Sequence, residues 1–494
     1  MDLVERVEQI LQELRPVFSR QAAFMWFVLV FWGIVLVDRE PALTSYLNAI
    51  GLGEQYYHHV VQWFQASSWS ASGLSQRWSQ WLVGHGQAKR LQGRLVYIGD
   101  SIKVMKAGSK MPLVKKLKQQ SQNINKPSWI RGHHFGLLSL LMGQGEALYA
   151  VPLQCQLQEG IRIYPVLSVQ SQWVLAIDYT QTLMVLGWLN SFYTPFKRSL
   201  VQQMADQSAD WVEKGSIVIL DAFYGVKPLL KLYRCVGLFL ISPVRRTTVA
   251  YAQFDYVPGA SGRGRPRLWG TKIKLASLFA QADTFATTTV TLYGRPTLVR
   301  YQTLQLHWDT PYELVQFVLS QLPCGRQVIL ITNDLLLSGP EVIQAYGWRF
   351  KIEVTFRTLV HLLGGFSYRF WLKALPKNGS WPHDVALNWL SGSQQQALLA
   401  KVESFERFVT LHALVLGVFQ ILALEAPKLI GFLCPQWFRT LPKHAYPSEQ
   451  VVRVTLRHLI NPFYAKLSPS LLLHKFLAHL STSPSTRKRT PLAA

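Results

Sequence analysis

The sequence predicts a mixed α/β fold in which helices cover the faces of one sheet. A three-strand meander is expected from three apolar runs, Leu95–Gly99, Phe135–Met142 and Ala147–Leu153. A β-α-β unit follows, made of strand Ile217–Leu220, helix Val226–Tyr233 and strand Leu238–Ser242. A long helical stretch, Thr180–Glu213, joins the two parts. This order of elements is typical of a mixed sheet with helices packed on it.

The chain is long and strongly basic. Its 494 residues exceed one ordinary core, so two to four domains are expected, and a content of 49% hydrophobic residues indicates a globular protein. The 51 Lys and Arg residues outnumber 27 Asp and Glu residues and are spread along the chain. This favours a broad surface for a polyanion, although a ribosome-associated or merely soluble basic protein has the same composition. Four cysteines without metal-ligand spacing argue against a zinc site and fit a reducing cytoplasm.

Residues 1–92 are predicted to form a helical domain. Residues 42–64 read as two helices around a Gly turn, a shape that can bind DNA but is equally a plain helical pair. The segment Gln21–Val37 is uncharged and at the short limit of a membrane span. We interpret it as a buried core helix, with a membrane-anchored basic protein as the alternative, and expect no membrane partner.

Composition also predicts the remaining boundaries. The expected segments are the first part of the core at 93–243, a β-rich insertion at 244–326, the second part of the core at 327–378, a helical C-terminal region at 379–480 and a disordered basic tail at 481–494. Two alternating β-type runs, Thr287–Tyr293 and Thr297–Leu306, define the insertion. Strand Val328–Thr332 then resumes the core.

Three acidic residues carry the functional prediction. Asp100 and Asp221 each follow an apolar β-type run, and Glu353 lies on a predicted helix. Two strands of one sheet and a helix packed on that sheet can bring three carboxylates together. Carboxylate oxygens suit Mg²⁺, and two such ions about 4 Å apart can activate an attacking oxygen and stabilise a leaving one. Each acid alone is more often a solvated strand end, so the prediction depends on the combination.

The helix that carries Glu353 has clear boundaries in the sequence. Ser338-Gly-Pro-Glu341 matches a capping box, and Gly364-Gly365 ends the helix. Its buried stripe is expected to contain Trp348, Ile352, Phe356, Leu359 and Leu363. A second face carries the polar side chains Tyr346, Arg349, Glu353 and Arg357.

At these residues the chain resembles DDE-type insertion-sequence transposases with a β-rich insertion between the second Asp and the Glu. That group has a signature of Tyr, two residues, Arg, three residues, Glu, six residues and Lys, which Tyr346, Arg349 and Glu353 match. The resemblance covers roughly Leu95 to Lys373 and includes Arg131–Gly136 and Gly264–Arg267. One departure is Val360, which stands where the signature has Lys.

The resemblance implies an RNase H-like catalytic core and a transposase that binds the terminal inverted repeats of its element. Asp100, Asp221 and Glu353 would hold Mg²⁺ or Mn²⁺, as two ions, for strand cleavage and transfer. The implied partners are double-stranded DNA, as transposon ends and target, and a second copy of the chain in the DNA complex. The implied location is the bacterial cytoplasm, at the nucleoid.

Further residues are expected to contact DNA or support the site. Tyr346 and Arg349 would hold a phosphate near the scissile bond, with Arg357 on the same helix. Lys103 and Lys106 begin a basic loop, Lys103–Lys126, that would track phosphates, although a solvated loop would be equally basic. The remaining candidates are Arg263, Arg265 and Arg267, as a minor-groove clip or a flexible turn, and His133 and His134, as support for the acids or as structural histidines.

Two other functions fit the same residues. An RNase H-like nuclease would need the three acids but would perform no strand transfer. A transposase remnant that only binds DNA is the second alternative, and Val360 is the residue that favours it.

Overall fold

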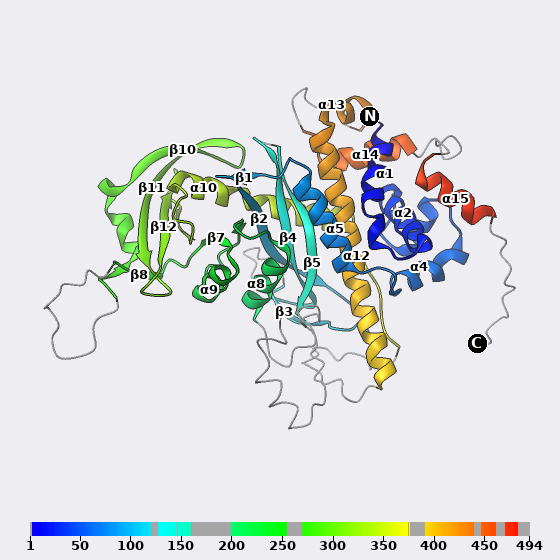
Figure 1. Ribbon diagram of the computed structural model, residues 1–494, viewed down its shortest axis with the longest axis horizontal. Helices are drawn as coiled ribbons and strands as arrows, with labels where there is room; N and C mark the ends of the chain where they lie inside the picture. Colours follow the sequence, from blue (N-terminus) through cyan, green and yellow to red (C-terminus); the bar gives the residue numbers. More distant parts are fainter. Residues whose placement is uncertain are drawn as a thin grey trace. The chain divides into compact units, whose positions relative to one another are not determined.

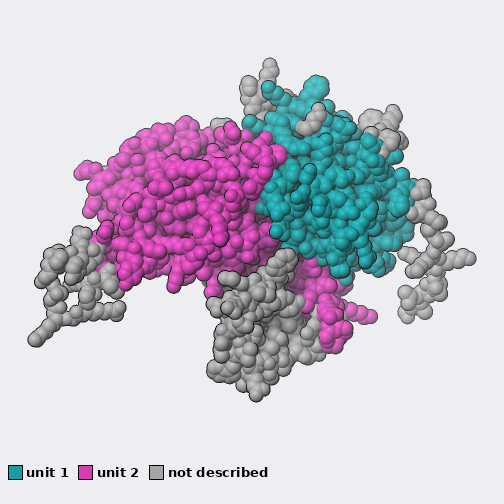
Figure 2. Space-filling view, viewed as in Figure 1, with its two compact units in different colours: residues 1–81, 358–368, 407–494 teal, residues 82–357, 369–406 magenta. Residues whose placement is uncertain are grey.

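The computed structural model describes residues 2–119, 127–145, 147–159, 199–253, 269–373, 375, 391–438, 446–460 and 470–482. The chain divides into two compact units, coloured separately in Figure 2. Unit 1 combines Met1–Trp81, Thr358–Tyr368 and Arg407–Ala494. Unit 2 combines Leu82–Arg357 and Arg369–Glu406. The two helical ends of the chain therefore contribute to one unit, and the central region forms the other.

Unit 2 is built on one mixed sheet (Figure 1). Its central strands are β2 (Arg94–Met105), β4 (Trp129–Gln144), β5 (Ala147–Glu159), β6 (Ile217–Ile219) and β7 (Phe239–Pro243). β4 pairs antiparallel with β2 and β5, whereas β6 pairs in parallel with β2 and β7. The resulting order, β5-β4-β2-β6-β7, is a three-strand meander followed by two parallel strands. The predicted mixed α/β class with an RNase H-like core is confirmed.

Two helices cover this sheet and are joined to each other. The helix α8 (Leu200–Trp211) packs on β4 and β5, and α9 (Lys227–Val236) packs on β7. A hydrogen bond of 2.7 Å links Ser208 Oγ on α8 with Tyr233 Oη on α9. α9 ends at Gly237, whose φ of 73° lies in the left-handed region that favours glycine. Residues 180–198 of the predicted helical stretch Thr180–Glu213 lie outside the described residues.

The strands after β7 extend the same sheet. They are β8 (Val249–Tyr251), β9 (Lys272–Lys274), β10 (Ala286–Leu292), β11 (Arg295–His307), β12 (Leu314–Gln321) and β13 (Gln327–Thr332). β13 pairs antiparallel with β7, and β12 and β11 follow it outward. The segment expected to be an inserted β-rich subdomain is thus joined to the core by backbone hydrogen bonds. β12, which the sequence pattern did not predict, provides part of that connection.

The strand that carries Asp100 is longer than its apolar run. β2 continues through Asp100 to Met105 because β4 pairs with it along this whole length, from Tyr97↔Leu140 to Met105↔Gly132. A short strand, β3 (Lys115–Lys118), also lies within the segment predicted to be a basic loop. Both predictions were wrong for the same reason, since polar residues join a sheet when a partner strand is available.

The helix predicted to carry Glu353 is interrupted at one residue. α10 (Gly339–Trp348) begins with the predicted capping box, in which Ser338 and Glu341 bond each other's backbone. α11 (Phe350–His361) follows directly, and Arg349 lies between them with α-helical backbone angles. α10 packs on β7 and on the strands β10 to β13. The Arg349 side chain therefore projects from a junction between two helices.

Unit 1 is helical in the part of the chain that the structure describes. Its α-helices, whole or in part, are α1 (Leu3–Glu13), α2 (Gln21–Leu36), α3 (Leu43–Ala49), α4 (Tyr57–Trp63), α5 (Ala71–Gly84), the end of α11, α12 (Gly392–Glu425), α13 (Pro427–Leu433), α14 (Glu449–Ile460) and α15 (Leu472–Thr482). α2 is the predicted core helix, buried from Ala23 to Leu36 and packed against α3, α4, α14 and α15. Among the described helices, α12 alone is long and apolar enough to cross a membrane, and 89% of its apolar window is buried inside the protein.

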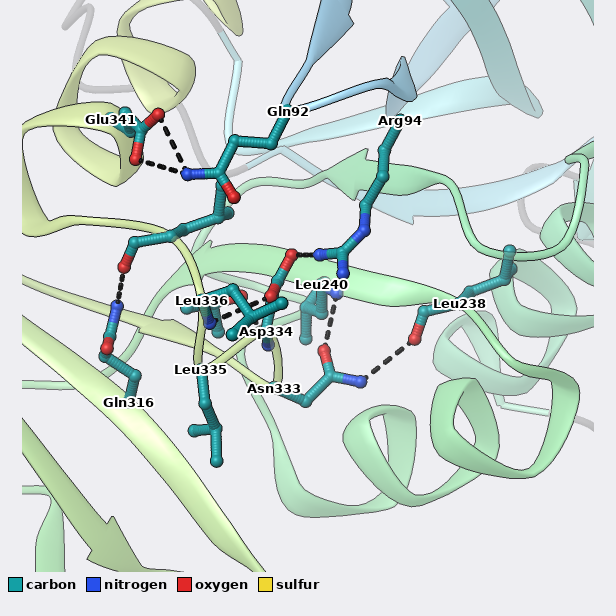
Figure 3. Close-up of polar contacts among 12 residues, drawn as sticks. Gln92, Arg94, Leu238, Leu240, Gln316, Asn333, Asp334, Leu335, Leu336 and Glu341 are labelled. Atoms are coloured by element: carbon teal, nitrogen blue, oxygen red, sulfur yellow. Dashed lines mark hydrogen bonds and ion pairs between the residues drawn. The ribbon is translucent and has the colours of Figure 1, made fainter.

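A polar cluster in unit 2 ties the start of β2 to the end of β13 and to α10 (Figure 3). Arg94 pairs with Asp334, which is 1% exposed. Gln92 Nε2 donates to both carboxylate oxygens of Glu341, at 3.1 and 3.0 Å. The Asn333 side chain bonds the backbone at the start of β7. Because β2 carries Asp100 and α10 leads to Arg349, this cluster fixes two elements that supply the candidate site.

Replacing Arg94 with Met should destabilise the protein by about 3–5 kcal/mol, because Asp334 would stay buried without its counter-charge. The double variant Arg94→Met with Asp334→Asn should recover most of the loss, because no uncompensated charge remains. Urea denaturation of both variants measures the effect. Equal destabilisation of the single and double variants would assign the loss to packing and contradict the ion-pair explanation.

Candidate active site

Asp100 and Asp221 line the same cavity in unit 2. β2 and β6 are in register at Ile98↔Ile219, and each acid lies two residues further along its chain. Because side chains alternate along a strand, both carboxylates lie on the same face and at the same edge of the sheet. The cavity has a volume of about 420 Å³ and is also lined by Ser101, Ile102, Lys103, Gln119, His134, Leu200, Phe223 and Tyr224.

The turn after β6 holds Asp221 in place. The Asp221 carboxylate accepts a hydrogen bond from the Phe223 N–H at 3.1 Å. Its backbone carbonyl accepts from the Tyr224 N–H at 3.1 Å and from Ser242 Oγ at 2.8 Å. A side chain at Gly225 would meet a β7 carbonyl oxygen at 1.9 Å, so glycine is required for this close approach. Sequence reasoning missed these four residues. Phe223, Tyr224 and Gly225 had only their position directly after Asp221 as a signal, and Ser242 had only its place at the end of a predicted strand.

Arg349 bridges two of the three acids. Its Nη1 donates to Asp100 Oδ2 at 3.1 Å, and its Nη2 donates to the Glu353 carboxylate. The Arg349 side chain is 17% exposed and the Glu353 side chain is 45% exposed. Tyr346 lies beside this group, where burial raises the pKa of its phenol and the positive charge of Arg349 opposes the rise. Asp100, Tyr346, Arg349 and Glu353, which were predicted to share one site, are thus brought together.

The acids are close enough to shift each other's pKa values. Burial raises the pKa of Asp100 to about 7, and the charge of Asp221 adds to this rise. Arg349 and the Ser101 N–H, which is 2.7 Å from Asp100 Oδ1, oppose it. Burial likewise raises the pKa of Asp221, and the charge of Glu353 adds to it. The site therefore concentrates negative charge where water solvates it poorly, which favours a bound cation.

This donor set fits a hard divalent cation, because the three acids offer only carboxylate oxygens. Arg349 is itself a cation that pairs with two of them, so its guanidinium occupies the position of a positive ion. Among the described residues, no group of three or more His, Cys, Asp and Glu side chains is arranged to hold a metal ion directly.

Two of the other predicted residues also lie at the cavity. His134 is 2% exposed and contributes to the cavity wall, and Lys103 lines it while its Nζ donates to the Lys118 carbonyl at 2.7 Å. His133 precedes His134 in β4 and projects to the opposite face of the strand. Its Nε2 lies 2.8 Å from the Pro112 carbonyl oxygen, and burial lowers the pKa of its ring to about 3. His133 is therefore a structural histidine.

The remaining predicted residues do not line the cavity, or lie outside the described residues. Lys106 is 7% exposed, and burial lowers the pKa of its ammonium to about 7. Arg357 is exposed on α11, one turn beyond Glu353. The predicted clip residues Arg263, Arg265 and Arg267 lie outside the described part of the chain.

Comparisons with known proteins support an endonuclease-type core. Residues 195–308 match a family model described as a DDE superfamily endonuclease, a segment that includes Asp221 and the strands β6 to β11. No curated protein matches the chain. One similar solved structure is a piggyBac transposase synaptic complex with hairpin DNA, with 10% sequence identity and a TM-score of 0.33. The match covers 98% of this chain and 84% of that one, and a TM-score of this size does not establish a common overall fold.

Asp100→Asn should raise the free energy of unfolding of the metal-free protein at pH 8. The buried carboxyl has a pKa of about 7 against an ordinary value of 3.8, so the folded state binds its proton more tightly than the unfolded state. Stability is therefore lost as the pH of the wild-type protein rises from about 4 to 7, and Asn cannot ionise. The advantage of the variant should shrink as the pH falls towards 4.

Denaturation at several pH values in the presence of a chelator measures this difference. Asp283→Asn is the matched control, because it makes the same change at an exposed position outside the acid cluster. A constant difference between Asp100→Asn and wild type across this range would contradict the buried, ionising carboxyl.

Proposed function

We propose that this protein is a DNA transposase that cleaves the ends of a mobile element and joins them to target DNA. The observation that carries the proposal is the gathering of Asp100, Asp221, Glu353 and Arg349 at one edge of an RNase H-like sheet. The DDE superfamily endonuclease match around Asp221 supports it independently. The substrate would be double-stranded DNA, in keeping with a formal net charge of +24.

Asp100, Asp221 and Glu353 would hold Mg²⁺ or Mn²⁺, as a pair of ions. Bound there, the metal would activate the attacking oxygen and stabilise the leaving oxygen. The chain's own residues position the DNA around the acids. Arg349 offers a planar fork for a phosphate, and Tyr346 lies beside it. Lys103 adds positive charge at the cavity wall, and buried His134 shapes that wall.

Other contacts with DNA would lie outside the cavity. Arg357 projects from α11 into solvent and would meet a phosphate further along the strand. Arg263, Arg265 and Arg267 would bind DNA from the segment between β8 and β9. Pairing of two element ends requires two sites, so we propose that a second copy of this chain joins the complex on DNA.

One residue favours a second candidate function, a protein that binds DNA without cleaving it. Val360 replaces the Lys of the signature, so one expected phosphate contact is lost. Against this, the three acids are all present and influence one another electrostatically. A nuclease without strand transfer would use the same acids, and only the joined product distinguishes it from a transposase.

Asp100→Asn, Asp221→Asn and Glu353→Gln should each abolish DNA cleavage in Mg²⁺ or Mn²⁺ while leaving DNA binding largely intact. Each change removes a ligand charge with little change in volume. Cleavage and joining of labelled duplexes from the element's ends measure both steps, and Asp283→Asn is the control that should retain activity. Near-normal cleavage by any one variant would remove that residue from the site, and wild-type binding without cleavage would favour the second candidate.

A further inference from the structure

We infer that Arg349 is a phosphate-responsive lock on the acid cluster. In the locked state its guanidinium pairs with Asp100 and Glu353 in place of a divalent cation, and a DNA phosphate draws it away before these acids bind metal. The inference rests on the proposed function and deepens it, because it specifies how DNA binding and metal binding are coupled in one site.

The lock follows from the contacts of the Asp100 carboxylate. Oδ1 accepts from the Ser101 N–H at 2.7 Å, and Oδ2 accepts from Arg349 Nη1 at 3.1 Å. The other guanidinium nitrogen pairs with Glu353. One positive group thus spans an acid on the sheet and an acid on α11. A divalent ion that bound the same oxygens would be repelled by this guanidinium at short range.

Arg349 is placed so that it can leave. It lies at the one-residue junction between α10 and α11, where its backbone is held but its long side chain remains 17% exposed. Glu353, at 45% side-chain exposure, opens directly to solvent. A guanidinium fork fits a phosphate as well as it fits a carboxylate. The same two nitrogens cannot bridge Asp100 and Glu353 while both bind a phosphate.

These two exclusive states couple the ligands. A phosphate that engages Arg349 frees carboxylate oxygens for metal, and a metal that binds the acids frees Arg349 for phosphate. Thermodynamic linkage makes the effect reciprocal, so DNA and metal should raise each other's affinity by the same factor. The enzyme would then take up its metal fully only when a DNA strand is already in place.

The test measures Mn²⁺ affinity of the full-length protein by electron paramagnetic resonance, without DNA and then with a duplex from the element's end. Arg349→Ala should bind Mn²⁺ about tenfold tighter than wild type without DNA, within the range of about 5–150-fold typical of coupled sites. Arg349→Lys, which keeps the charge but loses the fork, should be intermediate. Addition of the duplex should tighten Mn²⁺ binding by wild type but not by Arg349→Ala.

Lys272→Ala is the control, since it removes one positive charge from an exposed position on β9, at the outer edge of the sheet. It should leave Mn²⁺ affinity within about twofold of wild type, because an exposed charge far from the acids is largely screened. Equal tightening by Lys272→Ala and Arg349→Ala would assign the effect to net charge and overturn the lock. Equal Mn²⁺ affinity of wild type and both Arg349 variants without DNA would also overturn it.

The outcomes separate the lock from the proposed function. If wild type fails to cleave DNA but Arg349→Ala still tightens Mn²⁺ binding, the transposase assignment is wrong, whereas the competition between Arg349 and metal for the acids is supported. If wild type cleaves DNA through the three acids but Arg349 variants leave Mn²⁺ affinity unchanged, only the lock is wrong. Arg349→Lys provides the measurement if the alanine variant does not fold.

Discussion

The parallel pairing of β2 with β6 is the constraint on which the candidate site depends. Its register, Ile98↔Ile219, sets Asp100 and Asp221 side by side although they are far apart in sequence. Everything else at the site refines that placement. Ser242 and the backbone of the turn after β6 orient Asp221, and Arg349 ties the helix junction to Asp100. In this arrangement both carboxylates are poorly solvated, and burial raises their pKa values.

Short sequence patterns predicted those elements that depend on residues close together in the chain. Apolar runs marked the five central strands, and Ser338 with Glu341 marked the start of α10. The extension of β2 past Asp100, the strands β3 and β12, and the joining of the strands of the insertion to the core sheet were missed. Each of these depends on pairing with a distant strand, which no local window contains.

The same distinction separates the site residues. The helical spacing of Tyr346, Arg349 and Glu353 indicated a common face, and the structure brings these side chains together beside Asp100. The roles of His133 and His134 could not be distinguished from the sequence. Neighbouring side chains of a strand lie on opposite faces, and the register of β4 in the sheet decides which of the two faces the cavity. The pairing of Arg349 with the acids could not be predicted, since a guanidinium fork suits carboxylates and phosphates alike.

The most direct test of this account is the position of Mn²⁺ in a complex of the protein with its end duplex, located by anomalous diffraction. We predict metal density bounded by the carboxylates of Asp100, Asp221 and Glu353, with Arg349 turned to a DNA phosphate. Metal bound elsewhere, with Arg349 still paired to Asp100 and Glu353, would contradict the account.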